Sequence, residues 1–123
     1  MAEITLSIDG QDVSAELYDC ETAWALIESL PLTVTMSRWG EEYYGSIAAL
    51  NVDLAADARD VMEIGDLAYW LPGTSICIFF GPTPASHGDE PRAASNVNPL
   101  GKINGDTSFL HALGPTVSVA IRN

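Results

Sequence analysis

The chain has 123 residues, of which 47% are hydrophobic, and its 17 acidic and 5 basic residues give a net charge of −12. This length suits one domain with a single core, so we expect one domain over residues 1–123. No apolar run approaches the roughly 18 residues that a transmembrane helix needs, and the N-terminus shows no secretory signal. A strongly acidic surface repels phosphate groups. We therefore expect a cytoplasmic protein that binds neither nucleic acid nor membranes.

The sequence shows no sign of a metal site or a cofactor. Cys20 and Cys77 are far apart and lack metal-type spacing, so they are predicted to be reduced thiols, with Cys77 in the core. His87 and His111 have no third ligand at a recognisable spacing. We therefore predict neither a metal nor a cofactor.

The N-terminal segment, residues 3–18, alternates between apolar and polar side chains, which predicts two half-buried strands. Asp9 and Gly10 lie between the two runs, and this dipeptide favours the positive φ of a tight turn. The segment is therefore predicted to be a β-hairpin.

A helix is predicted over residues 23–30, where apolar side chains recur at a spacing of three to four. Asp19 can cap this helix and Pro31 ends it. Extended segments follow at 32–38 and 43–47, and an acidic turn joins them.

The middle of the chain is predicted to contain two neighbouring strands, 67–70 and 75–80. The alanines within residues 53–60 favour a helix, but the residues that follow do not continue it. We therefore predict a connection here. Residues 81–98 show no hydrophobic periodicity and are predicted to be a long loop. Loops of this length are often functional.

The C-terminal part is predicted to contain a strand at 97–103, a short helix that Asp106 caps, and a final strand at 117–121. Because about eight mostly antiparallel strands with one early and one late short helix need closure, we predict a mainly β fold, a closed eight-stranded β-barrel.

The strand at 75–80 runs into a stiff loop. Pro82 and Pro84 fix the backbone on either side of Thr83 and hold the Ser86 hydroxyl nearby. Such loops often present a surface to a ligand, whereas a tight turn after a closing strand would explain the same residues. Both interpretations remain open at the level of the sequence.

Three motifs occur in a fixed order and are specific when taken together: Arg38–Tyr44, Gly65–Trp70 and Phe79–Pro84. With the early and the late helix, they resemble the compact prokaryotic cyclophilin-like family over nearly the whole chain. The resemblance implies an eight-stranded barrel that is smaller than an ordinary cyclophilin, with a biochemical role that is not established.

Within this resemblance, Arg38 looks like the arginine that donates to the imide in prolyl isomerases, and Phe80 looks like the phenylalanine that lines their proline pocket. The other groove residues of cyclophilins are missing. Val97 stands where cyclophilins have a groove histidine, and Gln11, the only glutamine, lies on the first hairpin.

Several of these residues also have a structural explanation. Arg38 can pair with a carboxylate and stack on an aromatic ring. Trp39, Tyr69 and Trp70 can belong to the core or to the rim of the barrel. Glu90 can form an exposed salt bridge with the arginine that follows Pro91, which would be a weak anchor.

We predict a binding module whose groove accepts a small molecule or a proline-containing peptide without chemistry. The predicted groove residues are Arg38, Tyr44, Phe80, Thr83, Pro84, Ser86 and Glu90. The alternative is a weak or atypical peptidyl-prolyl isomerase in which Arg38 is the catalytic residue. A third class of function is self-association, which a homodimer would support.

Overall fold

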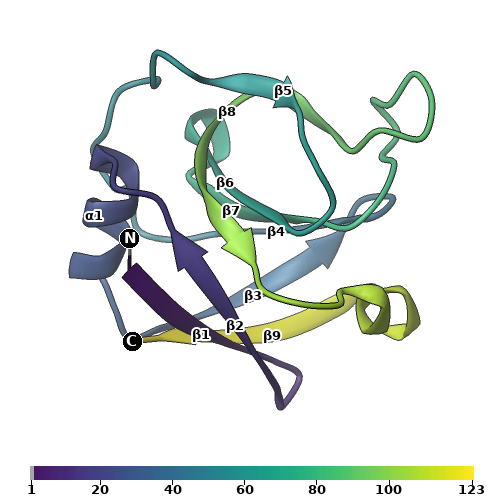
Figure 1. The fold of residues 1–123 in the computed structure, drawn as a ribbon, viewed down its shortest axis with the longest axis horizontal. Coiled ribbons are helices and arrows are strands. Elements are labelled where there is room, and N and C mark those ends of the chain that lie inside the picture. The colour runs from purple at the N-terminus through teal and green to yellow at the C-terminus, as the bar shows by residue number, and fades with distance from the viewer. Residues whose placement is uncertain (1) are drawn as a thin grey trace.

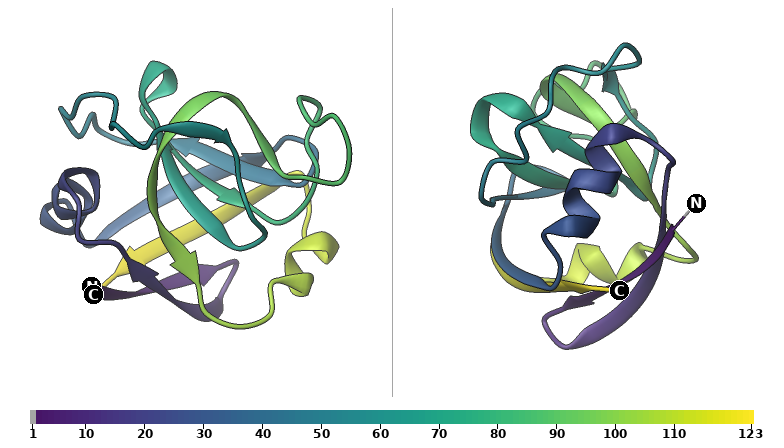
Figure 2. Two further views of the ribbon diagram at one scale, coloured as in Figure 1. Left: turned by 45° about the horizontal axis from the view of Figure 1, so that its top comes forward. Right: turned by 90° about the vertical axis from the view of Figure 1, so that its left-hand side faces the viewer.

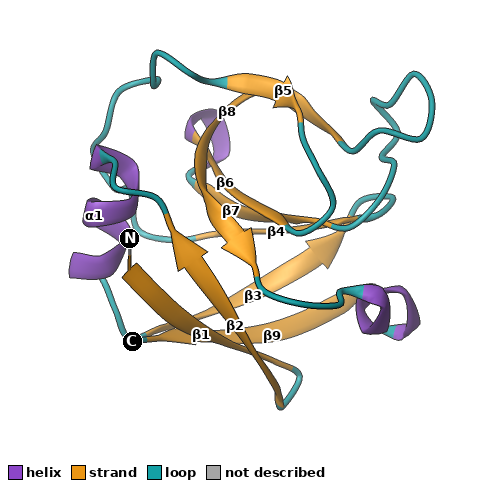
Figure 3. Ribbon diagram, in the orientation of Figure 1, coloured by secondary structure: helices purple, strands orange, loops and turns teal. Residues whose placement is uncertain are grey.

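The computed structural model describes residues 2–123, and this part of the chain forms nine strands, one α-helix and two short 3₁₀ helices (Figure 1). The strands are β1 (Ala2–Ile8), β2 (Gln11–Leu17), β3 (Leu32–Arg38), β4 (Glu42–Ser46), β5 (Arg59–Val61), β6 (Asp66–Trp70), β7 (Ser75–Phe79), β8 (Arg92–Ile103) and β9 (Thr116–Arg122). The helical segments are α1 (Glu21–Glu28), η1 (Leu71–Gly73) and η2 (Ser108–Ala112). The fold is mainly β, as predicted (Figure 3).

Eight strands form a ring of antiparallel pairs in the order β2, β1, β9, β3, β4, β7, β6 and β8, and β8 pairs back with β2. Leu17 lies opposite Gly101 where the ring closes. A Cβ atom on Gly101 would collide with the carbonyl group of Glu16, so only glycine fits there. The ninth strand, β5, lies outside the ring and pairs with β8.

The inside of the ring holds the main hydrophobic core. Alternate residues of β1, β3 and β9 are buried there, which is the period of two seen in the sequence. Tyr43 and Phe80 stack in this core with their ring centroids 5.5 Å apart. α1 lies across one end of the ring, where its Ala23 and Leu26 are buried in the same core (Figure 2).

A second apolar cluster lies on the outer face of β6 and β7. Its buried members are Met62, Ala68, Cys77, Phe79, Ala93 and Val97. β5 and the first half of β8 cover this face, and the backbone N–H of Met62 donates to the carbonyl of Pro91 at 2.9 Å. All five residues of β7 are buried because the strand is covered on both faces. This explains its continuous apolar sequence.

Most of the predicted elements are confirmed. The N-terminal hairpin turns at Asp9 and Gly10, which both have positive φ. β3 has the predicted bounds, and β6 and β7 are paired neighbours. Cys20 and Cys77 are free thiols, and Cys77 is buried.

Two predicted connections differ from the structure. The connection expected over 53–60 runs into a strand, since β5 begins at Arg59. The long loop expected over 81–98 ends earlier, because β8 begins at Arg92. The three residues after Ala93 are exposed, so the first half of β8 does not alternate and periodicity could not reveal it.

The helix ends also differ in detail. Cys20 rather than Asp19 is the residue that precedes α1, and its side chain makes no capping hydrogen bond. α1 ends at Glu28, before the predicted end. The late helix is a 3₁₀ helix, and the Asp106 carboxylate accepts the backbone N–H of Ser108 at 2.9 Å near its start. Within residues 2–123, no helix is long and apolar enough to cross a membrane.

Candidate functional site

The stiff loop after β7, residues 81–91, which we call the proline loop, is held together by its own side chains. The Thr83 hydroxyl donates to the carbonyl of Arg92. The Ser86 hydroxyl donates to the carbonyl of Glu90 and accepts the N–H of Thr83 at 2.9 Å. These hydroxyls therefore serve the structure of the loop, and most of their hydrogen-bonding capacity is already in use.

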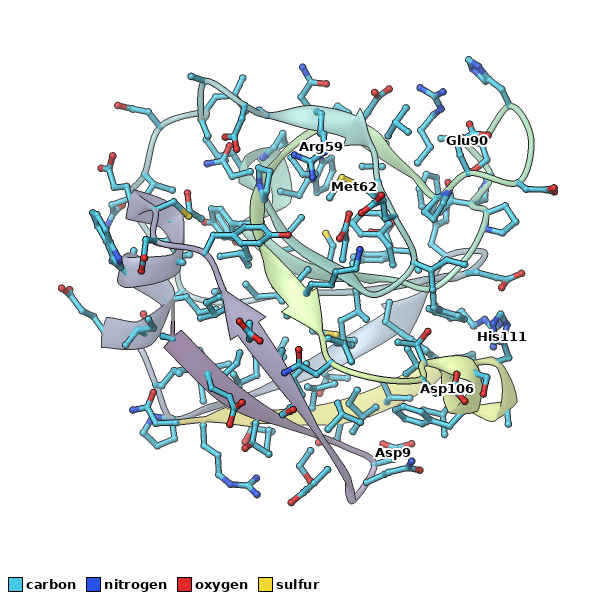
Figure 4. The ribbon with its side chains drawn as sticks, in the orientation of Figure 1. Asp9, Arg59, Met62, Glu90, Asp106 and His111 are labelled. Atoms are coloured by element: carbon cyan, nitrogen blue, oxygen red, sulfur yellow. The ribbon has the colours of Figure 1, made fainter. Side chains whose placement is uncertain are left out.

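Glu90 organises the tip of the proline loop (Figure 4). Its carboxylate accepts the N–H groups of His87 and Gly88, each at 2.8 Å, and pairs with Arg92 at 3.0 Å. The backbone N–H of His87 is the first of several hydrogen bonds that lower the pKa of Glu90 to about 2. The predicted salt bridge of Glu90 is confirmed, and Arg92 extends it to Asp60 on β5 at 2.9 Å.

Arg38, at the end of β3, connects η2 to the turn between β3 and β4. Its Nε donates to the carbonyl of Gly40 at 2.9 Å, and its Nη1 donates to the carbonyls of His111 and Leu113 at 3.2 and 3.3 Å. The guanidinium carbon lies 5.1 Å from the centre of the Phe80 ring. The aromatic contact expected for Arg38 is present, and its hydrogen-bond partners are backbone carbonyls rather than a carboxylate.

Phe80 lies in the core and not on the outer surface, since only 1% of the residue is exposed. Its ring packs between Tyr43 and the edge of the His111 ring, whose centroid is 5.0 Å away. His111, which Figure 4 shows on the η2 side of the molecule, pairs with Glu41 at 2.9 Å. Phe80 therefore holds η2 against the ring.

A cavity of about 170 Å³ lies on the outer face of the ring, beside β4 and β7. We call it the outer cavity. Its aromatic walls are Trp39, Tyr44 and Trp70, and its other lining residues on the ring are Glu42 and Cys77. The residues of β8 that line it are Ala93, Ala94 and Val97.

Strand geometry brings these side chains together. Glu42 and Tyr44 share the outward face of β4, while the residue between them points into the core. Tyr44 lies opposite Cys77 in the pairing of β4 with β7. Trp70, at the end of β6, donates its indole N–H to the hydroxyl of Ser95 on β8 at 2.7 Å. The first half of β8 thereby closes one side of the cavity.

The turn that carries Trp39 and Glu42 is held against the proline loop. These two residues exchange backbone hydrogen bonds of 2.8 and 3.2 Å, and Gly40 between them has a φ of 61°. A Cβ atom on Gly40 would lie 2.8 Å from both Thr83 and Pro84, and its positive φ also favours glycine. The proline loop therefore positions the turn without lining the cavity.

Glu42 is the acidic residue of the outer cavity, and only 4% of it is exposed. Its Oε1 atom has no hydrogen-bond partner among residues 2–123. Burial raises the pKa of Glu42 to about 7, and the neighbouring Cys77 thiol acts in the opposite direction. Burial, with a contribution from Glu42, also raises the pKa of the Cys77 thiol, which makes it a poor nucleophile. The cavity thus offers a buried carboxyl group with unused hydrogen-bonding capacity.

Of the residues predicted to form a groove, Tyr44 is the one that lines the outer cavity. The other predicted groove residues lie outside its lining and are Arg38, Phe80, Thr83, Pro84, Ser86 and Glu90. Those of the proline loop stabilise that loop or pack on the neighbouring turn, as described above. The structure therefore does not bring the predicted set together in one groove.

The sequence interpretation missed Glu42 altogether and assigned Trp39 and Trp70 to the core or to a barrel rim. One signal was available for Glu42, because a strand with a period of two places it on the same face as Tyr44. The burial of that face was not predictable, since it depends on the early start of β8. Cys77 was expected to be buried, but not beside a cavity.

The comparisons with known proteins agree with this fold. The model of the family described as Cyclophilin-like matches residues 2–122. The chain belongs to this family. The solution structure of a hypothetical protein from Archaeoglobus fulgidus is similar to this cyclophilin-like chain, with a TM-score of 0.79 and 34% sequence identity, over 98% of this chain and 92% of that one. The comparison with curated proteins gives no match. The resemblance inferred from the motifs is confirmed, and it names a fold rather than an activity.

Proposed function

We propose that this cyclophilin-like chain is a binding module, a closed β-barrel scaffold whose outer cavity accepts a small molecule or one side chain of a short peptide. The observation that carries the proposal is the Glu42 carboxyl group, which is buried at the cavity wall and has one oxygen without a partner in the described part of the chain. A buried polar group without a partner costs about 1–3 kcal/mol. A ligand with a hydrogen-bond donor would remove this cost.

The size and lining of the outer cavity support a small ligand. An apolar cavity of about 150 Å³ can hold one molecule of the size of benzene, and the outer cavity measures about 170 Å³. Apolar and aromatic walls with few polar groups are typical of ligand pockets. The small side chains of Ala93 and Ala94 leave this space open.

The alternative function, a weak peptidyl-prolyl isomerase, has less support. It needs Arg38 to donate to a substrate and Phe80 to line a surface pocket. Both Arg38 Nε and Nη1 already donate to backbone carbonyls, and Phe80 is 1% exposed. A protease-coupled isomerisation assay separates the two functions. We expect the wild type and Arg38→Ala to show the same background rate, whereas catalysis by the wild type alone would favour the enzyme.

An NMR ligand screen tests the binding proposal. The indole N–H signals of Trp39 and Trp70 report on the outer cavity. Trp24 lies on α1, is 55% exposed and reports on an unrelated surface. From a panel of common metabolites and proline-containing tetrapeptides, we expect at least one compound to shift the first two signals and not the third.

Two alanine variants provide the matched controls. Ala94→Leu fills the outer cavity from its exposed side and should abolish the shifts. Ala56→Leu changes an exposed loop position and should leave them intact. The proposal is wrong if no compound of the panel moves the Trp39 or Trp70 signal, or if Ala94→Leu responds as the wild type does.

A further inference from the structure

The outer cavity has an acidic residue in its lining and no basic one. Its lining includes the Glu42 carboxyl group and no lysine, arginine or histidine. Arg38 is directed to the core-side ring of Phe80, and Arg92 is paired with carboxylates of β5 and of the proline loop. No basic side chain described in residues 2–123 therefore neutralises Glu42.

The walls of the cavity add a second, independent preference. Trp39, Tyr44 and Trp70 surround the space beside Glu42. The faces of such rings carry negative potential, and cages of aromatic side chains bind methylated ammonium groups through cation–π interactions. The four remaining lining residues are Cys77, Ala93, Ala94 and Val97, whose side chains are apolar or a thiol. They favour a cation that is weakly hydrated, because a strongly hydrated ion would lose its water shell against apolar walls.

We propose that the outer cavity binds a methylated organic ammonium group, with the Glu42 carboxylate as its counter-ion and the rings of Trp39, Tyr44 and Trp70 as its walls. This inference rests on the proposed binding function and specifies the ligand class of the same site. The volume of about 170 Å³ is sufficient for one such head group.

A bare metal ion fits the same site less well. Calcium takes six to eight oxygen ligands and zinc about four nitrogen, sulfur or oxygen ligands. The cavity supplies one carboxyl group and the Cys77 thiol, whose pKa is raised by burial. Across the described part of the chain, no group of three or more His, Cys, Asp or Glu side chains is arranged to hold a metal ion.

Binding of a cation should be coupled to the release of a proton. The titratable groups that face Glu42 are the Cys77 thiol on β7 and the Tyr44 phenol on β4, while β6 and β8 contribute lining residues without charge. Glu42 has a pKa of about 7 in the free protein because it is buried. A bound cation favours the carboxylate, so its affinity should rise by up to about tenfold per pH unit below pH 7 and level off above it.

Choline and its uncharged carbon isostere, 3,3-dimethylbutan-1-ol, test the inference directly. They have nearly the same shape, so a difference in affinity reports on charge. We expect choline to quench or shift the fluorescence of Trp39 and Trp70 in a Trp24→Phe background, which removes the signal from α1. We expect the isostere to bind at least about tenfold more weakly at about pH 8.

Glu42→Gln keeps the shape of the side chain and removes the charge. It should weaken choline binding at least about tenfold, abolish the pH dependence and leave the isostere unaffected. Glu28→Gln on α1 is the exposed control and should bind choline as the wild type does. Ala94→Leu should weaken the binding of both probes, which would show that they occupy the outer cavity.

The outcomes separate this inference from the function on which it rests. Equal affinity for the two probes, or choline binding that survives Glu42→Gln, overturns the cationic ligand while leaving a binding cavity. The cationic ligand is also overturned if choline fails to bind over the whole range from about pH 5 to about pH 8. The proposed function is tested separately. It fails if the metabolite and peptide panel leaves the Trp39 and Trp70 signals unmoved, or if Ala94→Leu responds to the panel as the wild type does.

Discussion

The proline loop and the outer cavity are neighbours, yet they differ in how far their polar side chains are paired by hydrogen bonds. In the proline loop, the Ser86 hydroxyl donates to a carbonyl of the loop, the Thr83 hydroxyl donates to the carbonyl of Arg92 at the start of β8, and Glu90 accepts three hydrogen bonds. In the cavity, Glu42 is more deeply buried, and one of its carboxyl oxygens has no partner among the residues that the structure describes. A rigid loop with many polar residues can thus be fully occupied by itself. Unused hydrogen-bonding capacity is the better mark of a binding site.

The two glutamates make the contrast quantitative. The pKa of Glu90 is lowered to about 2, because backbone N–H groups and an arginine favour its charged form. The pKa of Glu42 is raised to about 7, because rings and aliphatic groups replace water around it. The same residue type is therefore fully paired in one place and buried with unused hydrogen-bonding capacity in the other.

The largest expected effect concerns the pH dependence that Glu42 imposes on stability. Its folded-state pKa lies above the ordinary value of 4.5, so the folded protein keeps a proton that the unfolded chain releases between pH 4.5 and about 7. Across this window the free energy of unfolding of the wild type should fall relative to that of Glu42→Gln, by about 3 kcal/mol at most. Urea denaturation across this pH range measures the difference.

Glu28→Gln on the exposed face of α1 is the control for this measurement. Its free energy of unfolding should depend on pH as that of the wild type does. Profiles of the wild type and Glu42→Gln that run parallel between pH 4.5 and about 7 would contradict the burial of an unpaired carboxyl group.

A smaller effect is expected from the hydroxyl that holds the proline loop. Thr83→Val removes the hydroxyl that donates to the part-buried carbonyl group of Arg92. The free energy of unfolding should fall by about 2 kcal/mol at every pH, since no titrating group is involved. Thr35→Val, at an exposed position of β3, is the matched control. Equal stability of the two variants would show that the loop does not depend on this hydrogen bond.

The smallest effect is expected at the tip of the proline loop and is local. Glu90→Gln weakens the bonds to the amides of His87 and Gly88, so these amides should exchange hydrogen faster while the melting temperature changes little. Because the pKa of Glu90 is lowered, its contribution is present above its ordinary pKa of 4.5 and is lost as the pH falls towards about 2. Asp89→Asn, on the adjacent exposed acid, should leave the exchange rates unchanged.

Hydrogen exchange followed by NMR at matched pH compares these two variants with the wild type. Equal protection of His87 and Gly88 in Glu90→Gln and the wild type would mean that another contact orders the loop tip.

Local patterns were sufficient for much of the fold. The alternation in β1, β3 and β9 and the turn at Asp9 and Gly10 are properties of short segments, and they appear in the structure as predicted. β5 and the first half of β8 were missed, because β5 has three residues and Ala93 is followed by three exposed ones. Neither segment shows the alternation of apolar and polar side chains by which a strand is recognised in a sequence.

The candidate site was less predictable than the fold. Pro82 and Pro84 identified a stiff loop. Whether the Thr83 hydroxyl was free depended on Arg92, a residue at the start of a strand that the sequence did not reveal. Tyr44 was predicted for a groove and lines the cavity, whereas Glu42, two residues earlier, was interpreted as part of an acidic turn and not as a groove residue.

By itself the sequence determined the mainly β class, most of the strands and the cyclophilin-like family, because these follow from side-chain periodicity, turn chemistry and motifs in a fixed order. Only the tertiary structure decided which polar groups find partners. The first half of β8 comes from a distant part of the chain, covers the outer face of β6 and β7, lines the cavity that holds Glu42 and supplies no donor to its Oε1 atom. Burial and hydrogen-bond pairing depend on neighbours in space, and a sequence records only neighbours along the chain.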